Sequence, residues 1–283
     1  MVVHETIAPL REALRAWRQA GQHIAFVPTM GNLHAGHLDL VHAARQSADR
    51  VVVSIFVNPL QFDEADDFAA YPRTLEADLA KLAECGVDVV FTPAEETLYP
   101  RGREAIAFVE VPALGEILEG AHRPGHFRGV TTVVAKLFHI VQPEVAVFGE
   151  KDYQQLLIVR RMVADLDFPV AIVSRPTVRE ADGLAMSSRN RRLDAGQRKI
   201  APTLYRVLRE TAERARGVGQ TAALEREAMA RLAEAGFRPE YVAIRDAADL
   251  GPHQAGRPGV VLGAARLGDV RLIDNVRIEN AEE

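Results

Sequence analysis

Two histidines and two glycines lie close together in the stretch TMGNLHAGHL. Gly31 and Gly36 have the spacing of the glycines in a phosphate-binding P-loop, but His37 stands where that loop requires a lysine. Because side chains three residues apart share one face of a helix, the imidazole rings of His34 and His37 can together donate hydrogen bonds to a phosphate. Such donors stabilise negative charge on a departing phosphate. The stretch therefore favours a contact with phosphate.

Two other interpretations of this histidine pair stay open, a metal site and a pair of histidines without a role. A zinc site needs three or four protein ligands, and the sequence contains neither a cluster of cysteines nor an H-E-x-x-H motif. His42 lies further along the same predicted helix, and we interpret it as a structural or surface residue.

The residues around the pair predict a strand followed by a helix. Residues 23–29 (HIAFVPT) form a short apolar run, and a helical period follows over residues 34–48. This order places the amino terminus of a helix at the carboxyl end of a strand, where free backbone N–H groups and the positive end of the helix dipole face a ligand. Gly31 permits a tight turn, and Gly36 lets a phosphate or a base approach the backbone.

Strands and helices alternate through the first part of the chain. The run RVVVSIFVN at residues 50–58 is rich in β-branched residues, as in a parallel strand that is covered on both faces. Further strands are predicted over residues 87–92, 145–148 and 170–174, and helices over residues 74–85, 130–141 and 152–164. Strands separated by helices imply right-handed βαβ units, so we expect an α/β fold with a Rossmann-like, doubly wound parallel sheet.

The pattern changes after residue 174. Residues 175–192 are rich in charge and contain a turn signal at Asp182 and Gly183. Two amphipathic stretches (194–216 and 220–235) and three short strands (240–246, 259–268 and 270–275) follow. Helices followed by strands suggest a small α+β domain. We therefore predict an α/β domain over residues 1–177 and a smaller α+β C-terminal domain over residues 178–283.

Polar residues follow two of the other predicted strands. Gln61 lies in the segment NPLQF, where its position favours a ligand-facing loop, although its side chain is equally suited to bind backbone or substrate. The segment FGEKDYQQ at residues 148–155 opens a helix, where Lys151 can neutralise a phosphate and Gln155 can point into the same cleft. Asp152 is equally suited to cap this helix and to bind a ribose.

Two loops add basic and hydroxyl side chains. The segment VREADGLAMSSR at residues 178–189 predicts a hairpin-like loop in which Ser187 and Ser188 offer small donors and Arg189 a bidentate contact to an oxyanion. A polar linker between domains is the alternative interpretation. The segment HRPGHFRG at residues 122–129 carries four basic side chains among glycines and a proline, which indicates an anion-facing loop or a surface turn.

Together these segments resemble the pantothenate synthetase family, the pantoate–β-alanine ligases, of the nucleotidylyltransferase superfamily whose hallmark is His-x-Gly-His. The resemblance covers nearly the whole chain through the segments PTMGNLHAGH, NPLQF, YPRT, HFRGVTTVVAKLF, FGEKDYQQ and MSSRN, in order and with family-like spacing. Asn32 and Ala35 differ from the residues often found at these positions in the family, but both are spacers.

The resemblance implies a two-step reaction that joins (R)-pantoate to β-alanine. ATP converts the pantoate carboxylate to pantoyl adenylate with release of pyrophosphate, and the amine of β-alanine then displaces AMP. The resemblance also implies Mg²⁺ bridging the phosphates, with its protein ligands unknown, a C-terminal domain that acts as a lid, and a homodimer.

The resemblance further implies roles for individual residues. His37, His34, Lys151 and Arg189 are implied to act on the phosphates as catalytic residues, and Asp152 to hold the ribose. The residues implied to bind ATP are Met30, Gly31, Asn32, Leu33, His34, Ala35, Gly36, His37, Gly149, Glu150, Lys151, Asp152, Val178, Met186, Ser187, Ser188 and Arg189. Gln61 and Gln155 are implied to bind pantoate, and Gln61 also to meet β-alanine.

Composition and charge restrict the class of protein. The chain has 283 residues, a net charge of −5 and a pI near 6.0, which does not favour a general nucleic-acid binder. Its one cysteine, Cys85, forms no internal disulfide, as in a reducing compartment, and we interpret it as a buried residue at a helix end. Charges interrupt the N-terminal stretch, which excludes a signal peptide, and the apolar run at residues 51–57 is too short to cross a bilayer. We expect a cytoplasmic protein with small-molecule partners and neither nucleic acid nor membrane.

Two alternative functions stay open. One is another adenylyl- or cytidylyltransferase of the same superfamily, acting on a different acid or phosphate. The other is a catalytically silent nucleotide-binding or regulatory protein. Turnover of ATP to AMP and pyrophosphate separates the silent protein from the two enzymes, and the acid that triggers turnover separates the enzymes from each other.

Overall fold

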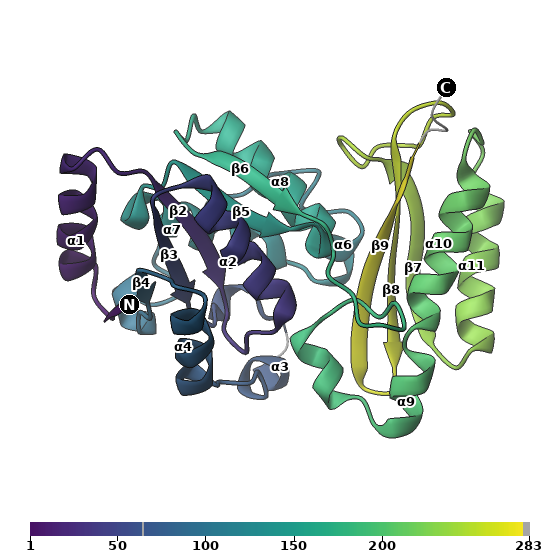
Figure 1. Ribbon diagram of the computed structural model, residues 1–283. Helices are drawn as coiled ribbons and strands as arrows, with labels where there is room; N and C mark the ends of the chain where they lie inside the picture. The colour runs from purple at the N-terminus through teal and green to yellow at the C-terminus, as the bar shows by residue number, and fades with distance from the viewer. Residues whose placement is uncertain (64, 280–283) are drawn as a thin grey trace. The chain divides into compact units, whose positions relative to one another are not determined.

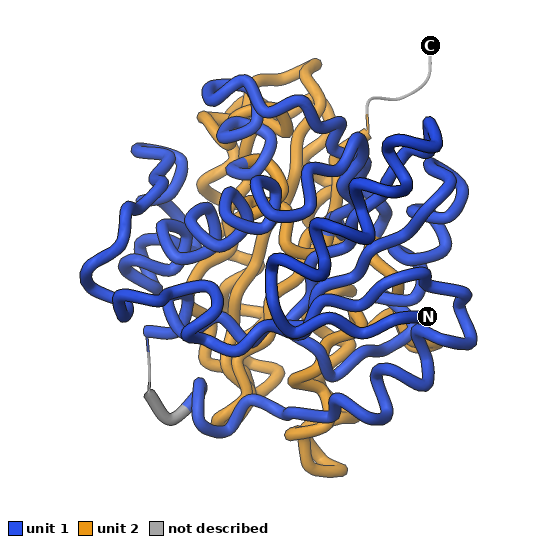
Figure 2. Tube along the Cα trace, turned by 90° about the vertical axis from the view of Figure 1, so that its left-hand side faces the viewer, with its two compact units in different colours: residues 1–150, 158–176 blue, residues 151–157, 177–283 orange. Residues whose placement is uncertain are grey.

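The computed structural model describes residues 1–63 and 65–279. The chain divides into two compact units (Figure 2). Unit 1 consists of Met1–Glu150 and Ile158–Pro176, and unit 2 of Lys151–Leu157 and the chain from Thr177 onward. The short segment Lys151–Leu157 thus belongs with the C-terminal residues, while the domain boundary predicted between residues 177 and 178 stays a prediction.

Unit 1 is built, within the described ranges, on a six-stranded parallel sheet in the order β1-β4-β3-β2-β5-β6 (Figure 1). Its strands are β1 Val2–His4, β2 Ile24–Thr29, β3 Arg50–Ile55, β4 Val89–Phe91, β5 Val145–Gly149 and β6 Ala171–Arg175. The chain moves outward from β2 in both directions, so the predicted Rossmann-like, doubly wound sheet is confirmed.

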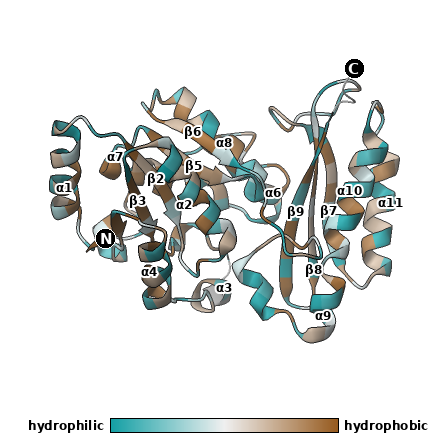
Figure 3. Ribbon diagram, viewed as in Figure 1, coloured by the Kyte–Doolittle hydropathy of each residue, from teal (hydrophilic) through white to brown (hydrophobic). Residues whose placement is uncertain are grey.

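Apolar residues without a polar alternation make the central strands. In β2 every residue except Pro28 is buried, and in β3 Val51, Val52 and Val53 are buried in succession. This continuous burial is expected of parallel strands that are covered on both faces. Figure 3 shows the corresponding hydrophobic residues along β2 and β3.

Helices flank this sheet and connect its strands. Helix α2 packs against β2, β3 and β5, whereas α7 packs against β2 and α1. The helices are α1 Ile7–Gln19, α2 Ala35–Ser47, η1 Pro59–Gln61, α3 Ala65–Ala69, α4 Leu75–Glu84, α5 Glu95–Leu98, α6 Glu119–His122, α7 His126–Val141, η2 Glu150–Asp152 and α8 Tyr153–Asp165.

Several element boundaries in unit 1 differ from the predictions, and those of α7 and β3 differ most. Helix α7 begins at His126, four residues before the predicted start, because Gly125 adopts a left-handed φ of 81° and begins a helix where the sequence signals a turn. Strand β3 ends at Ile55 rather than at residue 58, because Asn58 serves as the N-cap residue of η1. Strand β1 is not predicted, because its three residues are too few for a periodic signal.

Unit 2 contains an antiparallel sheet in the order β7-β8-β9, with the strands β7 Arg238–Asp246, β8 Gly259–Leu267 and β9 Val270–Ile278. Its helices are η3 Ser188–Arg192, α9 Ala195–Ile200, α10 Thr203–Ala215 and α11 Ala222–Glu234. The predicted small α+β fold is confirmed. The amphipathic stretch predicted over 194–216 is two helices, because Pro202 lacks an N–H group and interrupts the helical hydrogen bonds.

A separate apolar core holds unit 2 together. Leu204, Val207 and Leu208 of α10 pack with Leu232 of α11 and with Val261 of β8, all of them buried. In the described part of the chain, no helix is both long enough and apolar enough to cross a bilayer.

Candidate active site

The turn that follows β2 lies where the strand order reverses. Strand β2 pairs with β3 on one side and with β5 on the other (Figure 1). The two halves of the sheet therefore extend from β2 in opposite directions. In open α/β sheets this point, at the carboxyl ends of the strands, is where ligands bind. The stretch from Met30 to His37 begins directly after β2.

His34 and His37 lie together at the start of α2, as their spacing predicts. Their ring centroids are 4.1 Å apart. His34 is the N-cap residue, and its Nδ1 accepts a hydrogen bond from the backbone N–H of Gly36 at 3.2 Å. The Nδ1 of His37 in turn accepts from the backbone N–H of His34 at 3.3 Å. Since both Nδ1 atoms accept, each neutral ring carries its proton on Nε2, where it can be donated to a ligand.

The backbone N–H groups of Asn32 and Leu33, in the turn before α2, are engaged within the protein. Their N–H groups donate to the carboxylate of Asp78, at 2.7 Å and 2.8 Å. The N–H of Gly31 is also engaged, by the hydroxyl of Thr29 at 3.2 Å. Sequence reasoning does not single out Asp78, because an acidic residue in the first turn of a helix is common. A ligand at this turn therefore cannot use the backbone N–H groups of Asn32 and Leu33.

Gln61 ends η1, and its side-chain oxygen is engaged within the protein. The Nδ2 of Asn58 donates to Oε1 of Gln61 at 3.0 Å and to the carbonyl of Gly129 at 3.1 Å. The Oδ1 of Asn58 accepts from the N–H of Leu60 at 3.3 Å and from the hydroxyl of Tyr99 at 2.7 Å.

These partners fix the orientation of both amides. The Leu60 N–H can only donate and the Gly129 carbonyl can only accept, so the oxygen and nitrogen of Asn58 cannot be exchanged. Burial raises the pKa of Tyr99 far above its usual value, so its hydroxyl stays neutral and remains a donor. Gln61 can therefore offer its Nε2 group, a hydrogen-bond donor, to a ligand.

Basic residues around the start of α7 contact the same loop. The Nδ1 of His126 lies 2.7 Å from the backbone carbonyl of Gln61, and Nη2 of Arg123 donates to the same oxygen at 3.0 Å. The guanidinium of Arg123 also lies 3.0 Å from the carboxylate of Asp63 and 3.5 Å from that of Glu119. Arg123 and His126 therefore hold the backbone of the Gln61 loop in place.

The loop after β5 begins at the same edge of the sheet as Met30. Gly149 is the last residue of β5 and pairs with Arg175 of β6. The carboxylate of Glu150 accepts from the hydroxyl of Ser174 at 2.9 Å, and Arg175 binds Asp39 of α2 through two contacts of 2.9 Å and 3.1 Å.

In unit 2, Lys151 and Asp152 lie beside each other. The Lys151 Nζ is 3.6 Å from the Asp152 carboxylate, and the Lys151 carbonyl accepts from Nδ2 of Asn275 at 2.9 Å. Gln155 lies half-buried in the first turn of α8. Lys151, which the sequence assigns to phosphate, and Gln155, which it assigns to the acid, thus lie in the same short segment, Lys151–Leu157.

The stretch from Val178 to Met186 forms a hairpin that belongs to unit 2. The carbonyl of Val178 accepts from the N–H of Met186 at 3.0 Å, and Arg179 forms a β-bridge with Ala185. Arg179 is held by the buried carboxylate of Asp274 in β9, at 2.6 Å and 2.9 Å. Burial raises the pKa of Asp274, although Arg179 opposes this effect. The hairpin is therefore anchored within unit 2 by the pair of Arg179 and Asp274.

The hydroxyl residues follow this hairpin directly. Ser187 is the N-cap of η3, and its Oγ accepts from the N–H of Arg189 at 3.2 Å. Ser188 and Arg189 form the first turn of η3, and both are half-buried. The Ser187 hydroxyl therefore orders the backbone that carries the guanidinium.

Residues 2–277 match the family model described as pantoate-beta-alanine ligase. The chain belongs to this family. A pantothenate synthetase of Thioalkalivibrio sulfidiphilus (strain HL-EbGR7) is 59% identical over 276 residues, which cover 97% of this chain and 96% of the relative. The predicted family, and with it the predicted enzyme class of a ligase that joins pantoate to β-alanine, is confirmed.

Crystal structures of this ligase family share the fold over the whole chain. The pantothenate synthetase of Thermus thermophilus is 49% identical, with a TM-score of 0.88 over 98% of this chain and 99% of that chain. The pantoate–β-alanine ligase of Francisella tularensis, solved in complex with beta-gamma ATP and beta-alanine, is 35% identical, with a TM-score of 0.84 over 99% of each chain.

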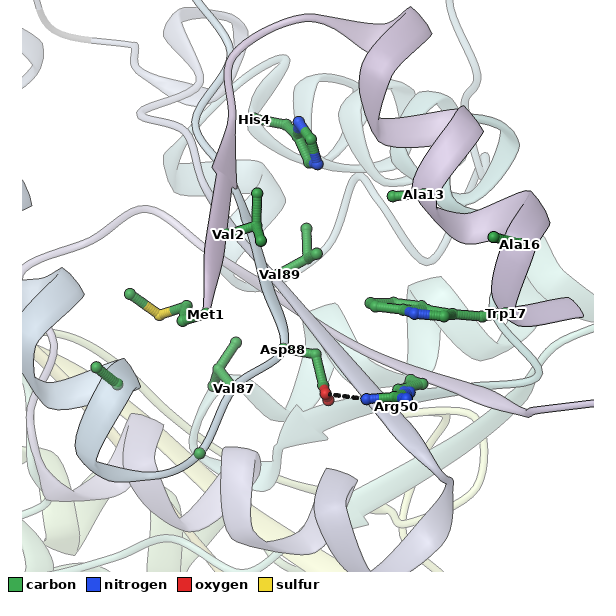
Figure 4. Close-up of a pocket in the computed structure, with 12 residues that line it drawn as sticks. Met1, Val2, His4, Ala13, Ala16, Trp17, Arg50, Val87, Asp88 and Val89 are labelled. Carbon is green, nitrogen blue, oxygen red and sulfur yellow. Dashed lines mark hydrogen bonds and ion pairs between the residues drawn. The ribbon is translucent and has the colours of Figure 1, made fainter. Parts of the chain in front are cut away.

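A cavity of about 570 Å³ in this ligase lies at the opposite, amino-terminal edge of the parallel sheet (Figure 4). Trp17 of α1, Arg50 at the start of β3 and Asp88 before β4 line it. Arg50 binds Asp88 at 2.8 Å and lies over the Trp17 ring, 5.2 Å from its centroid. Among the described residues that line this cavity, none is a predicted site residue, and the charges of Arg50 and Asp88 neutralise each other.

Proposed function

We propose that this ligase activates pantoate with ATP as pantoyl adenylate, releases pyrophosphate, and then lets the amine of β-alanine displace AMP. The observation that carries this proposal is the pair of imidazole Nε2–H donors at the start of α2, at the point where the strand order reverses. A site without the P-loop lysine is suited to stabilise a pyrophosphate that leaves the α-phosphorus. The Francisella tularensis structure, solved in complex with beta-gamma ATP and beta-alanine, also supports it.

We assign the phosphates to His37 and His34, with Lys151 and Arg189 as further cationic donors. In the transition state negative charge moves onto the leaving pyrophosphate, so donors that bind it more tightly than they bind ATP lower the barrier. The remaining nucleotide contacts that we propose are Met30, Gly31, Asn32, Leu33, Ala35, Gly36, Gly149, Glu150, Asp152 at the ribose, Val178, Met186, Ser187 and Ser188. Because the N–H groups of Asn32 and Leu33 bind Asp78, these two residues contribute shape rather than backbone donors.

We assign pantoate to Gln61 and Gln155, with Gln61 also near β-alanine. The Gln61 Nε2 group is a donor, so it suits a carboxylate or hydroxyl oxygen of the acid. Holding the carboxylate in line with the α-phosphorus removes much of the entropic cost of the first step, an effect of several kcal/mol.

We further propose that Mg²⁺ accompanies the ATP phosphates. Mg²⁺ is usually held by substrate phosphates and by one or two carboxylates rather than by a protein cage. Among the residues that the structure describes, no group of three or more His, Cys, Asp or Glu side chains is placed to hold a metal ion. Bound to the phosphates, the ion would neutralise part of their charge.

We propose that the protein is a cytoplasmic homodimer. The resemblance to the family supports the dimer, and the single cysteine suits a reducing compartment. Sedimentation of the purified protein over a range of concentrations tests the dimer, and fractionation of cells that express the full chain tests the location.

The experiment that tests the reaction is isotope exchange without the amine. Purified protein with Mg·ATP, (R)-pantoate and labelled pyrophosphate, but no β-alanine, should return label to ATP, because the first half-reaction is reversible. Omission of pantoate should abolish the exchange, and addition of β-alanine should convert the mixture to pantothenate and AMP. Exchange with another acid but not with pantoate would support a different nucleotidylyltransferase. Failure of all acids, in a folded protein that binds ATP, would support the silent nucleotide-binding protein.

A further inference from the structure

The turn before the histidines has the backbone shape of an anion-binding loop. Gly31 and Asn32 have consecutive positive φ angles of 80° and 50°. Successive backbone N–H groups in a turn can form a concave site for an anion. In this protein the N–H groups of Asn32 and Leu33 converge on the carboxylate of Asp78, at 2.7 Å and 2.8 Å. The anion that occupies the loop is a side chain of the protein itself.

Burial and further hydrogen bonds keep the Asp78 carboxylate in this position. Its side chain is fully buried, and it also accepts a hydrogen bond from the Thr74 hydroxyl at 3.0 Å. The Lys81 Nζ lies 4.0 Å from the carboxylate and donates to the carbonyl of Leu33 at 2.7 Å. A buried carboxylate is tolerated when it is paired and hydrogen-bonded in this way. Helix α4 therefore binds Leu33 twice, through Asp78 at its N–H and through Lys81 at its carbonyl.

The fit around this carboxylate is close. A Cβ atom at Gly31 would lie 3.2 Å from Oδ2 of Asp78 and 3.0 Å from Cγ2 of Ile55. The carboxylate therefore contacts the turn directly. His34 follows Leu33 at once in an extended conformation, with φ −131° and ψ 175°, and its Nδ1 caps α2.

We propose that Asp78 is a positioning residue for His34 and His37, a role that rests on the proposed function of these histidines. By binding the N–H groups of Asn32 and Leu33, Asp78 fixes the backbone just before His34. The backbone N–H groups of His34 and Gly36 then orient the two imidazole rings through their Nδ1 atoms. The phosphates of the nucleotide then meet the imidazole rings and not the N–H groups of Asn32 and Leu33.

The first test compares two variants of Asp78 with a matched control. In Asp78→Asn one carboxylate oxygen becomes an NH₂ group that faces a backbone N–H, and in Asp78→Ala both acceptors are lost. Pantoate-dependent ATP–pyrophosphate exchange should fall by about 10²-fold in both, because displaced catalytic groups lose rate steeply. Formate should restore part of the rate in Asp78→Ala, where it can fill the space of the lost carboxylate, and should not do so in Asp78→Asn.

The control is Asp88→Asn at the amino-terminal edge of the same sheet. Asp88 also accepts a backbone N–H, from Val51 at 2.9 Å, but it lies away from the histidines beside Arg50. This variant should lose stability and keep its exchange rate. If Asp78→Asn is folded and exchanges at the wild-type rate, or if Asp88→Asn loses as much rate as Asp78→Asn, the positioning role is wrong.

A second readout does not depend on activity. In ¹⁵N NMR spectra at neutral pH, His34 and His37 of the wild-type protein should show the Nε2–H tautomer, and Asp78→Asn should show a mixture of tautomers. If the wild-type protein shows no exchange with any acid, the proposed function fails, while these spectra still report whether Asp78 orders the rings. Unchanged spectra in a folded Asp78→Asn protein would overturn the proposal.

Discussion

The turn after β2 and the loop after β3 leave neighbouring strands at the same edge of the sheet, yet they fix their polar side chains differently. In the turn, the rings of His34 and His37 are oriented by backbone N–H groups within three residues of each other. In the loop, the Gln61 amide is oriented by Asn58, which is itself held by the distant Tyr99 and Gly129.

The difference concerns how many parts of the fold a donor depends on. The orientation of the two imidazole rings depends on the start of α2 and on the Asp78 carboxylate, which binds the turn before this helix. The orientation of the Gln61 amide depends on Asn58, which is bonded to Tyr99 and Gly129 in two further segments of unit 1. We therefore expect damage to the turn to affect the chemical step, and damage to the loop to affect the selection of the acid.

The largest effect is expected from His37→Ala. This variant removes one of the two Nε2–H donors, so kcat should fall by roughly 10²–10³-fold, the usual loss when one transition-state donor is removed. The KM for pantoate should change little. Steady-state kinetics on protein with a wild-type circular dichroism spectrum measure both constants. A folded His37→Ala protein with near-native kcat would show that His37 does not act in the chemical step.

An intermediate effect is expected from Gly129→Ala. A Cβ atom there would lie 2.2 Å from the carbonyl oxygen of Leu60, so η1 must move away from α7. Overpacking of this kind costs about 1–3 kcal/mol of stability. The KM for pantoate should rise more than the KM for ATP, because Gln61 moves with η1.

The matched control for this prediction is Gly219→Ala, where an added Cβ meets Ala255 at an ordinary 3.8 Å. Thermal unfolding of both variants separates lost stability from lost selection. An equal rise of both KM values in Gly129→Ala would show that the loop does not act on pantoate alone.

The smallest effect is expected from Tyr99→Phe. It removes one of the two hydrogen bonds to Oδ1 of Asn58 and keeps the buried ring. A net loss of about 1 kcal/mol, typical of one hydrogen bond, corresponds to a rise of roughly fivefold in the KM for pantoate. The effect should not vary with pH near neutrality, because burial raises the pKa of Tyr99 and keeps its hydroxyl protonated.

Thr211→Val in α10 is the control, since it also removes a buried hydroxyl, one that donates to the Val207 carbonyl at 2.7 Å. Thr211→Val should lower the free energy of unfolding by about 1 kcal/mol, as expected for one lost hydrogen bond, and should leave the KM for pantoate unchanged. If the two variants have the same KM, the Tyr99 hydroxyl contributes stability only.

The sequence by itself determined the alternation of the strands β2 to β6 with helices, because hydrophobic period and turn residues act over a few neighbouring positions. It also determined the histidine pair, since the ring positions follow from a three-residue spacing at the start of a helix. The early start of α7 and the break at Pro202 were missed, because glycine and proline signals compete with the helical period at these places.

Only the tertiary structure decided which donors remain for a ligand. Asp78 takes the N–H groups of Asn32 and Leu33 from 46 and 45 positions away, and Asn58 reaches Gly129 across 71 positions. No local pattern marks such contacts, because a carboxylate in the first turn of a helix looks the same whether it faces solvent or a buried turn. Burial makes the difference, since a polar group removed from water must find a partner wherever the fold places one.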